Sequence, residues 1–191
     1  MELFAGLFLA AVAGVGAFMV RGNDSPERLY WWAGFTPYIL MGLVGAGVTA
    51  GIEQAKLIYQ GVAVLAAVLG SVGILLAAVA RFLKPVPEMW ANIAFAVTLG
   101  IVIASLGAGA APYAGVVGLA ILLGIVALGV GRVGELGLGA GLLAAGAFLL
   151  ALSPMMAPAL SQNFLTGMSI ANIMFLQNAL GLALIVEGAR R

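Results

Sequence analysis

The chain has 191 residues, of which 64% are hydrophobic, with only eight Lys and Arg and seven Asp and Glu residues. A soluble domain is about 25% charged, so this composition excludes a soluble globular fold and a disordered chain. The absence of Cys and His removes disulfides, thiolate chemistry and the side chain that most often binds metals or exchanges protons near neutral pH. The sequence therefore predicts an integral membrane protein.

Stretches without charge define the expected membrane spans in chain order. Residues 3–20, 29–52 and 57–80 carry no charged side chain, and each suits one helix of about 20 residues. The stretches 89–131 and 136–186 each suit two helices. The first of these breaks at residues 107–112. The second breaks between Ser153 and Gln162, where prolines and polar residues interrupt the apolar run.

We therefore expect an all-α membrane protein with a single domain over residues 1–191, a seven-transmembrane-helix bundle. Long runs of Leu, Ala and Gly favour helices over the short alternating strands of a barrel. The expected helices lie near 2–20, 29–50, 57–82, 89–107, 113–131, 135–153 and 165–187.

The basic residues set the expected orientation. With seven spans, seven of the eight basic residues fall on the side that holds the C-terminus, and only Lys56 falls on the other. Basic residues in short loops stay in the cytoplasm. We therefore expect the N-terminus outside and the C-terminus in the cytoplasm.

Glycine is abundant, with 28 residues, and small residues four apart allow helices in lipid to approach closely. Such rows are open to two interpretations, packing within the bundle or an interface between chains. They are Gly6/Ala10/Gly14, Gly42/Ala46/Ala50, Ala120/Gly124 and Gly137/Gly141/Ala145.

No ionisable residue lies deep in an expected span, which argues against a proton pump, a coupled transporter or an enzyme. The candidate functional residues are therefore amides and hydroxyls. Four of them on the last helix share an arc of about 140° that should face protein, whereas Asn178 lies outside it. Interhelical hydrogen bonds and a ligand-binding or pore-lining stripe remain alternative roles. The candidate polar interior is Gln60, Asn92, Thr166, Ser169, Asn172 and Gln177.

The first helix junction and the last helix carry a resemblance to a known family. Residues 18–22, the segment 24–30 and Pro37 resemble the junction between helices A and B of haloarchaeal rhodopsins. Residues 181–185 resemble the close of helix G. Together with the seven-helix plan, the chain resembles the microbial (type 1) rhodopsins over roughly residues 1–50 and 88–131.

The departures from that family remove its pigment chemistry. The resemblance implies that Ala179 stands where the family has its retinal-binding lysine, and that Phe175 replaces the carboxylate four residues earlier. Residues 58–61 carry no counter-ion. The aromatic residues that hold the polyene are replaced by Leu143, Gly146 and Leu150. We therefore expect no retinal and no other cofactor or metal.

Three functions remain open. The first is a non-photoactive, rhodopsin-like membrane protein that acts as an interaction or structural partner, either in a homo-oligomer or with another membrane protein. The second is a passive channel or permease for a small solute. The third is a non-covalent binder of an apolar ligand such as a carotenoid or lipid. We expect membrane lipids as neighbours, no nucleic-acid partner, and a location in a prokaryotic plasma membrane.

Overall fold

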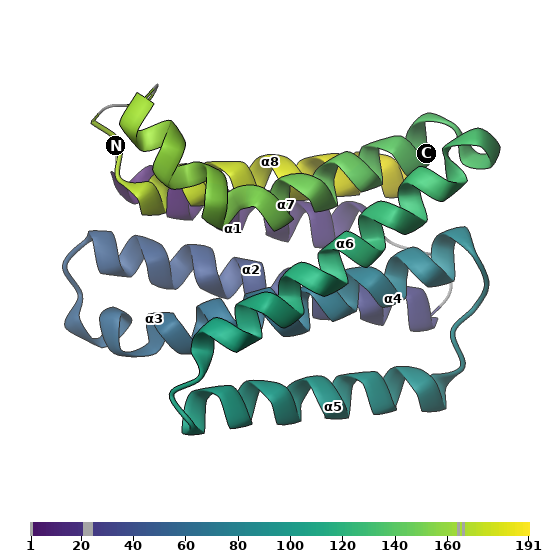
Figure 1. Cartoon of the computed structure of the whole chain (residues 1–191), viewed down its shortest axis with the longest axis horizontal. Helices are drawn as coiled ribbons and strands as arrows, with labels where there is room; N and C mark the ends of the chain where they lie inside the picture. The colour runs from purple at the N-terminus through teal and green to yellow at the C-terminus, as the bar shows by residue number, and fades with distance from the viewer. Residues whose placement is uncertain (1, 21–24, 164, 166) are drawn as a thin grey trace.

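The computed structural model describes residues 2–20, 25–163, 165 and 167–191, and within them every regular element is helical. The helices run antiparallel in sequence order between the two ends of the bundle (Figure 1). Their bounds are α1 Glu2–Met19, α2 Ser25–Thr49, α3 Glu53–Leu65, the π-helical segment η1 Ala66–Gly70, α4 Ser71–Phe82, α5 Glu88–Gly107, α6 Ala111–Leu136, α7 Leu138–Asn163 and α8 Ile170–Arg190.

Because α3, η1 and α4 follow one another without a break, the described elements form seven rods, as the charge-free stretches predict. Six of these are long and apolar enough to cross a membrane, and Leu3–Met19 adds a shorter apolar helix. The connections are short. Gly137 alone joins α6 to α7, and its φ of 62° is one that glycine adopts without a steric cost.

The break expected between Ser153 and Gln162 is wrong, because α7 continues to Asn163 through Pro154 and Pro158. Each proline removes one backbone hydrogen bond, and neighbouring helices make that loss tolerable inside a membrane bundle. Here the Ser153 hydroxyl donates to the Met174 carbonyl of α8 at 3.4 Å, which ties the two helices together beside the first proline. The last helix then begins at Ile170 instead of 165.

Close glycine contacts join the main helix pairs. A Cβ atom on Gly6 of α1 would lie 2.6 Å from the Gly42 carbonyl oxygen of α2, and a Cβ on Gly42 would lie 2.5 Å from the Gly6 oxygen. Gly124 and Gly141, from the other two rows, meet no such backbone. Two of the four predicted rows therefore pack helices within the bundle, and the other two contain glycines without such a close contact.

The bundle is unevenly packed. Helix α8 lies against both α7 and α1, and α6 lies against α7. Helix α5 lies along one edge of the molecule (Figure 1). It buries only Ala91, Thr98, Val102 and Ser105. The core is therefore centred on α1, α2, α7 and α8, and α5 presents most of its surface outward.

Candidate ligand pocket within the bundle

A cavity of about 330 Å³ lies between α2, α3 with η1, α6, α7 and α8. Its wall is mostly apolar and combines large leucine, methionine and tyrosine side chains with small ones, among which Ala63, Ala66, Ala67 and Ala151 contribute only a methyl group each. Ligand pockets in proteins begin at about 300 Å³ and combine apolar walls with a few polar groups. The cavity meets both conditions, since Tyr38, Tyr59, Ser153 and Asn178 also line it.

The π-helical segment η1 forms one wall of this pocket. It supplies Ala66 and Ala67, and the Ala67 carbonyl oxygen lies only 2.2 Å from where a Cβ of Gly118 would stand. Single π-helical turns inside α-helices are rare and often lie at functional sites. Because Gly118 has no side chain, the backbone of α6 packs directly against the backbone of η1. This contact fixes the position of η1 in the pocket wall.

Two hydroxyls at the pocket already donate to backbone carbonyls. The Ser71 hydroxyl donates at 2.7 Å to the carbonyl oxygen of Ala67, a residue of the wall. The hydroxyl of Ser153, in the wall itself, donates to the Met174 carbonyl oxygen. These two hydroxyls stabilise the wall of the pocket and have no hydrogen free for a ligand.

The Asn178 amide and the Tyr59 hydroxyl differ from them. Neither side chain takes part in a hydrogen bond with any other described residue. Tyr59 is held by the ring of Phe175, whose centroid lies 6.4 Å away in an edge-to-face arrangement. The pocket therefore offers an amide from α8 and a hydroxyl from α3 that have no protein partner among the residues described.

The mouth of the pocket lies between α6 and α7. Val116 and Met155 line the cavity and are 63% and 68% exposed. Pro154 stands beside Met155 and removes the amide hydrogen that would bond to the Leu150 carbonyl. Both Leu150 and Pro154 line the cavity, so the helix lacks one backbone hydrogen bond beside the pocket.

The structure places the predicted polar interior only in part. Asn172 is buried, with 2% of its surface exposed, and Gln177 is half-buried. Gln60 and Asn92 are exposed instead, because Ala63 lines the pocket from α3 and Ala91 takes the buried position on α5. Thr166 lies outside the described residues.

Ser169 does not belong to an interior stripe either. Its side chain is exposed, and its hydroxyl accepts a hydrogen bond from the Asn172 backbone amide at 3.4 Å. It is the N-cap of α8. Serine at this position satisfies one of the amides that the first helical turn leaves unpaired.

The predicted arc on the last helix spans the outward side of α8. Asn172 and Gln177 stand about 140° apart on the helix, at the two edges of the arc, and Leu176 and Leu180 between them are 38% and 54% exposed. The Asn172 edge faces α1, because Ala183 on the same side lines a groove with α1. The Gln177 edge faces α7, where Gly188 meets Gly139. The two amides therefore lie at separate helix contacts and form no continuous stripe.

Both amides leave a buried oxygen unpaired among the described residues, Oδ1 of Asn172 and Oε1 of Gln177. Asn178, which the arc excluded, lines the pocket. It stands three residues before Gly181 and seven before Ile185, on the side of α8 that packs against Gly146 of α7, and no pattern within the sequence of α8 alone marks that side.

The positions that the rhodopsin resemblance singles out lie in the core. Ala179 and Phe175 are each 1% exposed, and the Phe175 ring fills the space where a side chain on Gly45 would stand. Leu150 lines the pocket, and Leu143 is fully buried. Gly146 allows α7 and α8 to touch, because its Cβ would lie 2.4 Å from the Gly181 carbonyl oxygen.

Comparison with protein-family models, curated proteins and solved structures finds no match to this chain. The pocket and the surfaces of the bundle are therefore the features that bear on function.

Proposed function

We propose that the protein binds an elongated apolar ligand with one hydrogen-bonding end, without a covalent bond and without catalysing a reaction. The observation that carries the proposal is the cavity of about 330 Å³ with the free Asn178 amide in its wall. An apolar body suits the alanine and leucine lining. The amide gives the polar end of the ligand a partner where water is excluded.

The position of the mouth supports uptake from the membrane. Val116 and Met155 at the mouth are exposed apolar side chains, so in a bilayer they would lie against lipid chains. A ligand dissolved in the membrane could then enter between α6 and α7 without crossing water. A carotenoid-like pigment, an isoprenoid or a lipid has the required shape and polarity.

The test uses a substitution that fills the pocket. Ala63→Phe places a ring in the cavity, and we expect the purified variant to lose the compound that the wild type carries at about one per chain. Solvent extraction followed by mass spectrometry measures this occupancy. The matched control is Ala127→Phe on the exposed side of α6, which should retain the compound. Asn178→Leu should retain less of it than the wild type does.

Two results would overturn the proposal. One is the absence of any compound near one per chain in the wild type purified in mild detergent. The other is equal occupancy in the wild type and Ala63→Phe, which would place the compound elsewhere on the protein.

A second function, as an interaction or structural partner in the membrane, is favoured by the outward surface of α5. This surface carries a row of residues spaced four apart, and Gly100 within it has no neighbouring atom within 4 Å of a Cβ. Small residues in such rows let two transmembrane helices approach closely. The exposed row is Asn92, Ala96, Gly100, Ala104 and Ala108.

If a second chain packs on this row, Gly100→Ile should convert dimers into monomers in sedimentation experiments, because the new side chain separates the two backbones. Val97→Ile, on the same helix but outside the row, should leave the dimer intact. A wild type that sediments as a monomer in mild detergent at every protein concentration would exclude this second function for a homodimer.

We infer the orientation from the basic residues. Arg81, Lys84, Arg132 and Arg190 belong to the end of the bundle that holds the C-terminus, and Lys56 belongs to the other end (Figure 1). The excess of basic residues in short loops favours a cytoplasmic C-terminus. The microbial-rhodopsin resemblance and the prokaryotic plasma membrane belong to the same proposal, and the sequence motifs alone support them.

A further inference from the structure

A second cavity, separate from the ligand pocket, runs along the outer surface between α1 and α8. Its volume is about 360 Å³, and its wall is apolar for most of its length. Ala11 and Val15 line it from α1, and Ala183 and Val186 line it from α8. Val15 is 57% exposed, so the cavity is a groove that opens outward, and in a bilayer it would face lipid.

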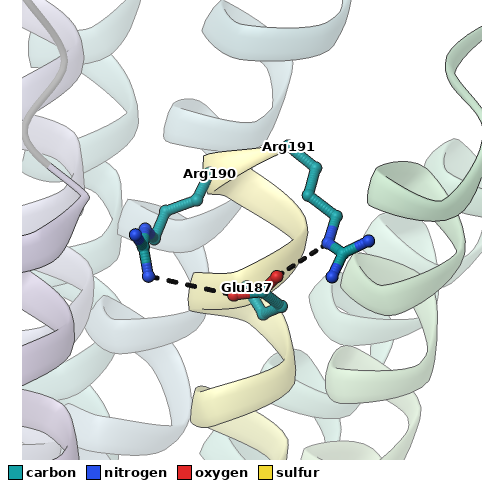
Figure 2. Close-up of polar contacts among 3 residues, drawn as sticks. All are labelled: Glu187, Arg190 and Arg191. Atoms are coloured by element: carbon teal, nitrogen blue, oxygen red, sulfur yellow. Dashed lines mark hydrogen bonds and ion pairs between the residues drawn. The ribbon is translucent and has the colours of Figure 1, made fainter.

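The groove ends at a cluster of three charged side chains. Glu187 and Arg190 line its end, and Arg191 lies on the far side of Glu187 (Figure 2). The Arg191 Nε donates to Glu187 Oε1 at 2.7 Å, whereas the nearest Arg190 nitrogen stands 3.9 Å from Glu187 Oε2. One carboxylate thus faces two guanidinium groups, and the three side chains together carry a net positive charge.

Arg190 is the member of the cluster that is available to a ligand. Its ion pair with Glu187 is long, and its side chain is 48% exposed at the end of the groove. A guanidinium group presents a planar set of donors that matches a phosphate, and the resulting charge-assisted hydrogen bonds are among the strongest in proteins. The charge at this end of the groove is therefore complementary to a phosphate group.

From this juxtaposition we propose that the α1–α8 groove binds an anionic phospholipid, with an acyl chain between the two helices and the phosphate at Arg190. The apolar wall accounts for the chain, and the net positive cluster accounts for a preference for an anionic over a zwitterionic headgroup. A neutral headgroup would gain no charge interaction at Arg190. The site does not depend on the ligand proposed for the inner pocket.

The chain contains no cysteine, so a single introduced cysteine can carry a fluorescent label. Ala11→Cys, labelled with bimane, reports on the groove roughly 12 Å from its charged end along α1. The labelled full-length protein is reconstituted in phosphatidylcholine bilayers that contain a small fraction of lipid brominated midway along its chain. The quenching lipid is either phosphatidylglycerol or phosphatidylcholine at the same fraction.

We expect brominated phosphatidylglycerol to occupy the groove about fivefold more strongly than brominated phosphatidylcholine, which is the preference expected for one basic residue at a membrane surface. Arg190→Gln should abolish this preference. Arg132→Gln is the matched control, because Arg132 is also an exposed arginine paired with a glutamate three residues away, at the end of α6. This control should keep the full preference.

A second label at Val130→Cys on the exposed side of α6 separates a specific site from general lipid contact, and both brominated lipids should quench it equally. Equal quenching of the Ala11 label by the two lipids would overturn the proposal. So would a preference that persists in Arg190→Gln, or one of the same size at Val130. Loss of the preference in Ala183→Phe, which fills the groove, would place the lipid chain between α1 and α8.

Discussion

Glycines that look alike in the sequence have opposite roles once their surroundings are known. A Cβ on Gly146 would stand 2.4 Å from the Gly181 carbonyl oxygen and 2.9 Å from the Ile185 backbone nitrogen. Gly131 on α6 is helical too, but it has no neighbouring atom within 4 Å of a Cβ. At the first position glycine allows two helices to touch, and at the second it only weakens its own helix.

We therefore expect Gly146→Ala to lower the free energy of unfolding by about 1–3 kcal/mol, because the methyl group forces α7 and α8 apart. Gly131→Ala should raise it by about 0.5–1 kcal/mol, since alanine is the better helix former. Unfolding by SDS titration from mixed micelles measures both. A change of stability in the same direction for both variants would contradict the close contact between Gly146 of α7 and Gly181 of α8.

The surroundings of each residue also decide which of the site residues could be predicted from the sequence. An amide in an apolar span must find a partner or a cavity, and for this reason the sequence pointed to the polar residues of the last helix. It could not decide the direction of each amide, because one helix contacts neighbours on two sides. Asn178 is in the pocket because α7 lies on the Gly181 side of α8, and no single-helix pattern contains that information.

At the scale of the elements, the rod formed by α3, η1 and α4 is distinguished by the π-helical turn within it. A π-helical turn corresponds to one residue inserted into an α-helix, and removing that residue can restore the regular helix without rotating either flank. Deleting a residue from a regular helix rotates everything beyond it by about 100°. The two deletions should therefore have very different consequences.

Deletion of Ala67, in η1, should give a folded protein that has lost the pocket wall and its bound compound. Deletion of Leu76, in α4, should prevent folding, because Ala77 and Ala78 would leave the core and the contacts with α2 would be lost. Circular dichroism and size-exclusion chromatography in detergent distinguish the two outcomes. If both deletions are equally damaging, η1 is not an inserted turn.

At this scale the sequence predicted the ends of the first four rods within one residue, and its largest error is the end of α7. Charged clusters marked most of the connections, because charges leave the bilayer. The prolines misled the prediction for α7, since a proline terminates a helix readily in water but not where neighbouring helices supply support. The π-helical segment has no proline or charge within it, so nothing in its composition indicates the change in hydrogen bonding.

For the whole molecule, the testable property is the alternation of its ends across the membrane. Lys84 follows α4 and Gln162 lies in the last turn of α7, at opposite ends of the bundle (Figure 1). Single cysteines at these two positions should react with a membrane-impermeant maleimide from opposite sides of sealed vesicles. We expect Lys84→Cys to react from the cytoplasmic side. Reaction of both from one side would contradict the alternation.

The number of rods and their order were predictable because they follow from length and charge alone. Their packing was not, because contacts between helices far apart in the sequence, such as α1 with α8, depend on which small residues face each other. The pocket and the outer groove both lie between such helices. The sequence therefore predicted a membrane bundle but did not locate either cavity.

The unequal lengths of the helices bear on the bilayer itself. Helix α1 has 18 residues and α6 has 26, which corresponds to roughly 27 Å and 39 Å of helix. A hydrocarbon layer of about 30 Å exceeds the length of α1, so a bilayer around the bundle would thin beside α1, whereas α6 is long enough to cross it while tilted. Figure 1 shows α6 crossing the bundle obliquely. Hydrophobic mismatch is thus built into the chain, and it makes thin membranes the ones that deform least around it.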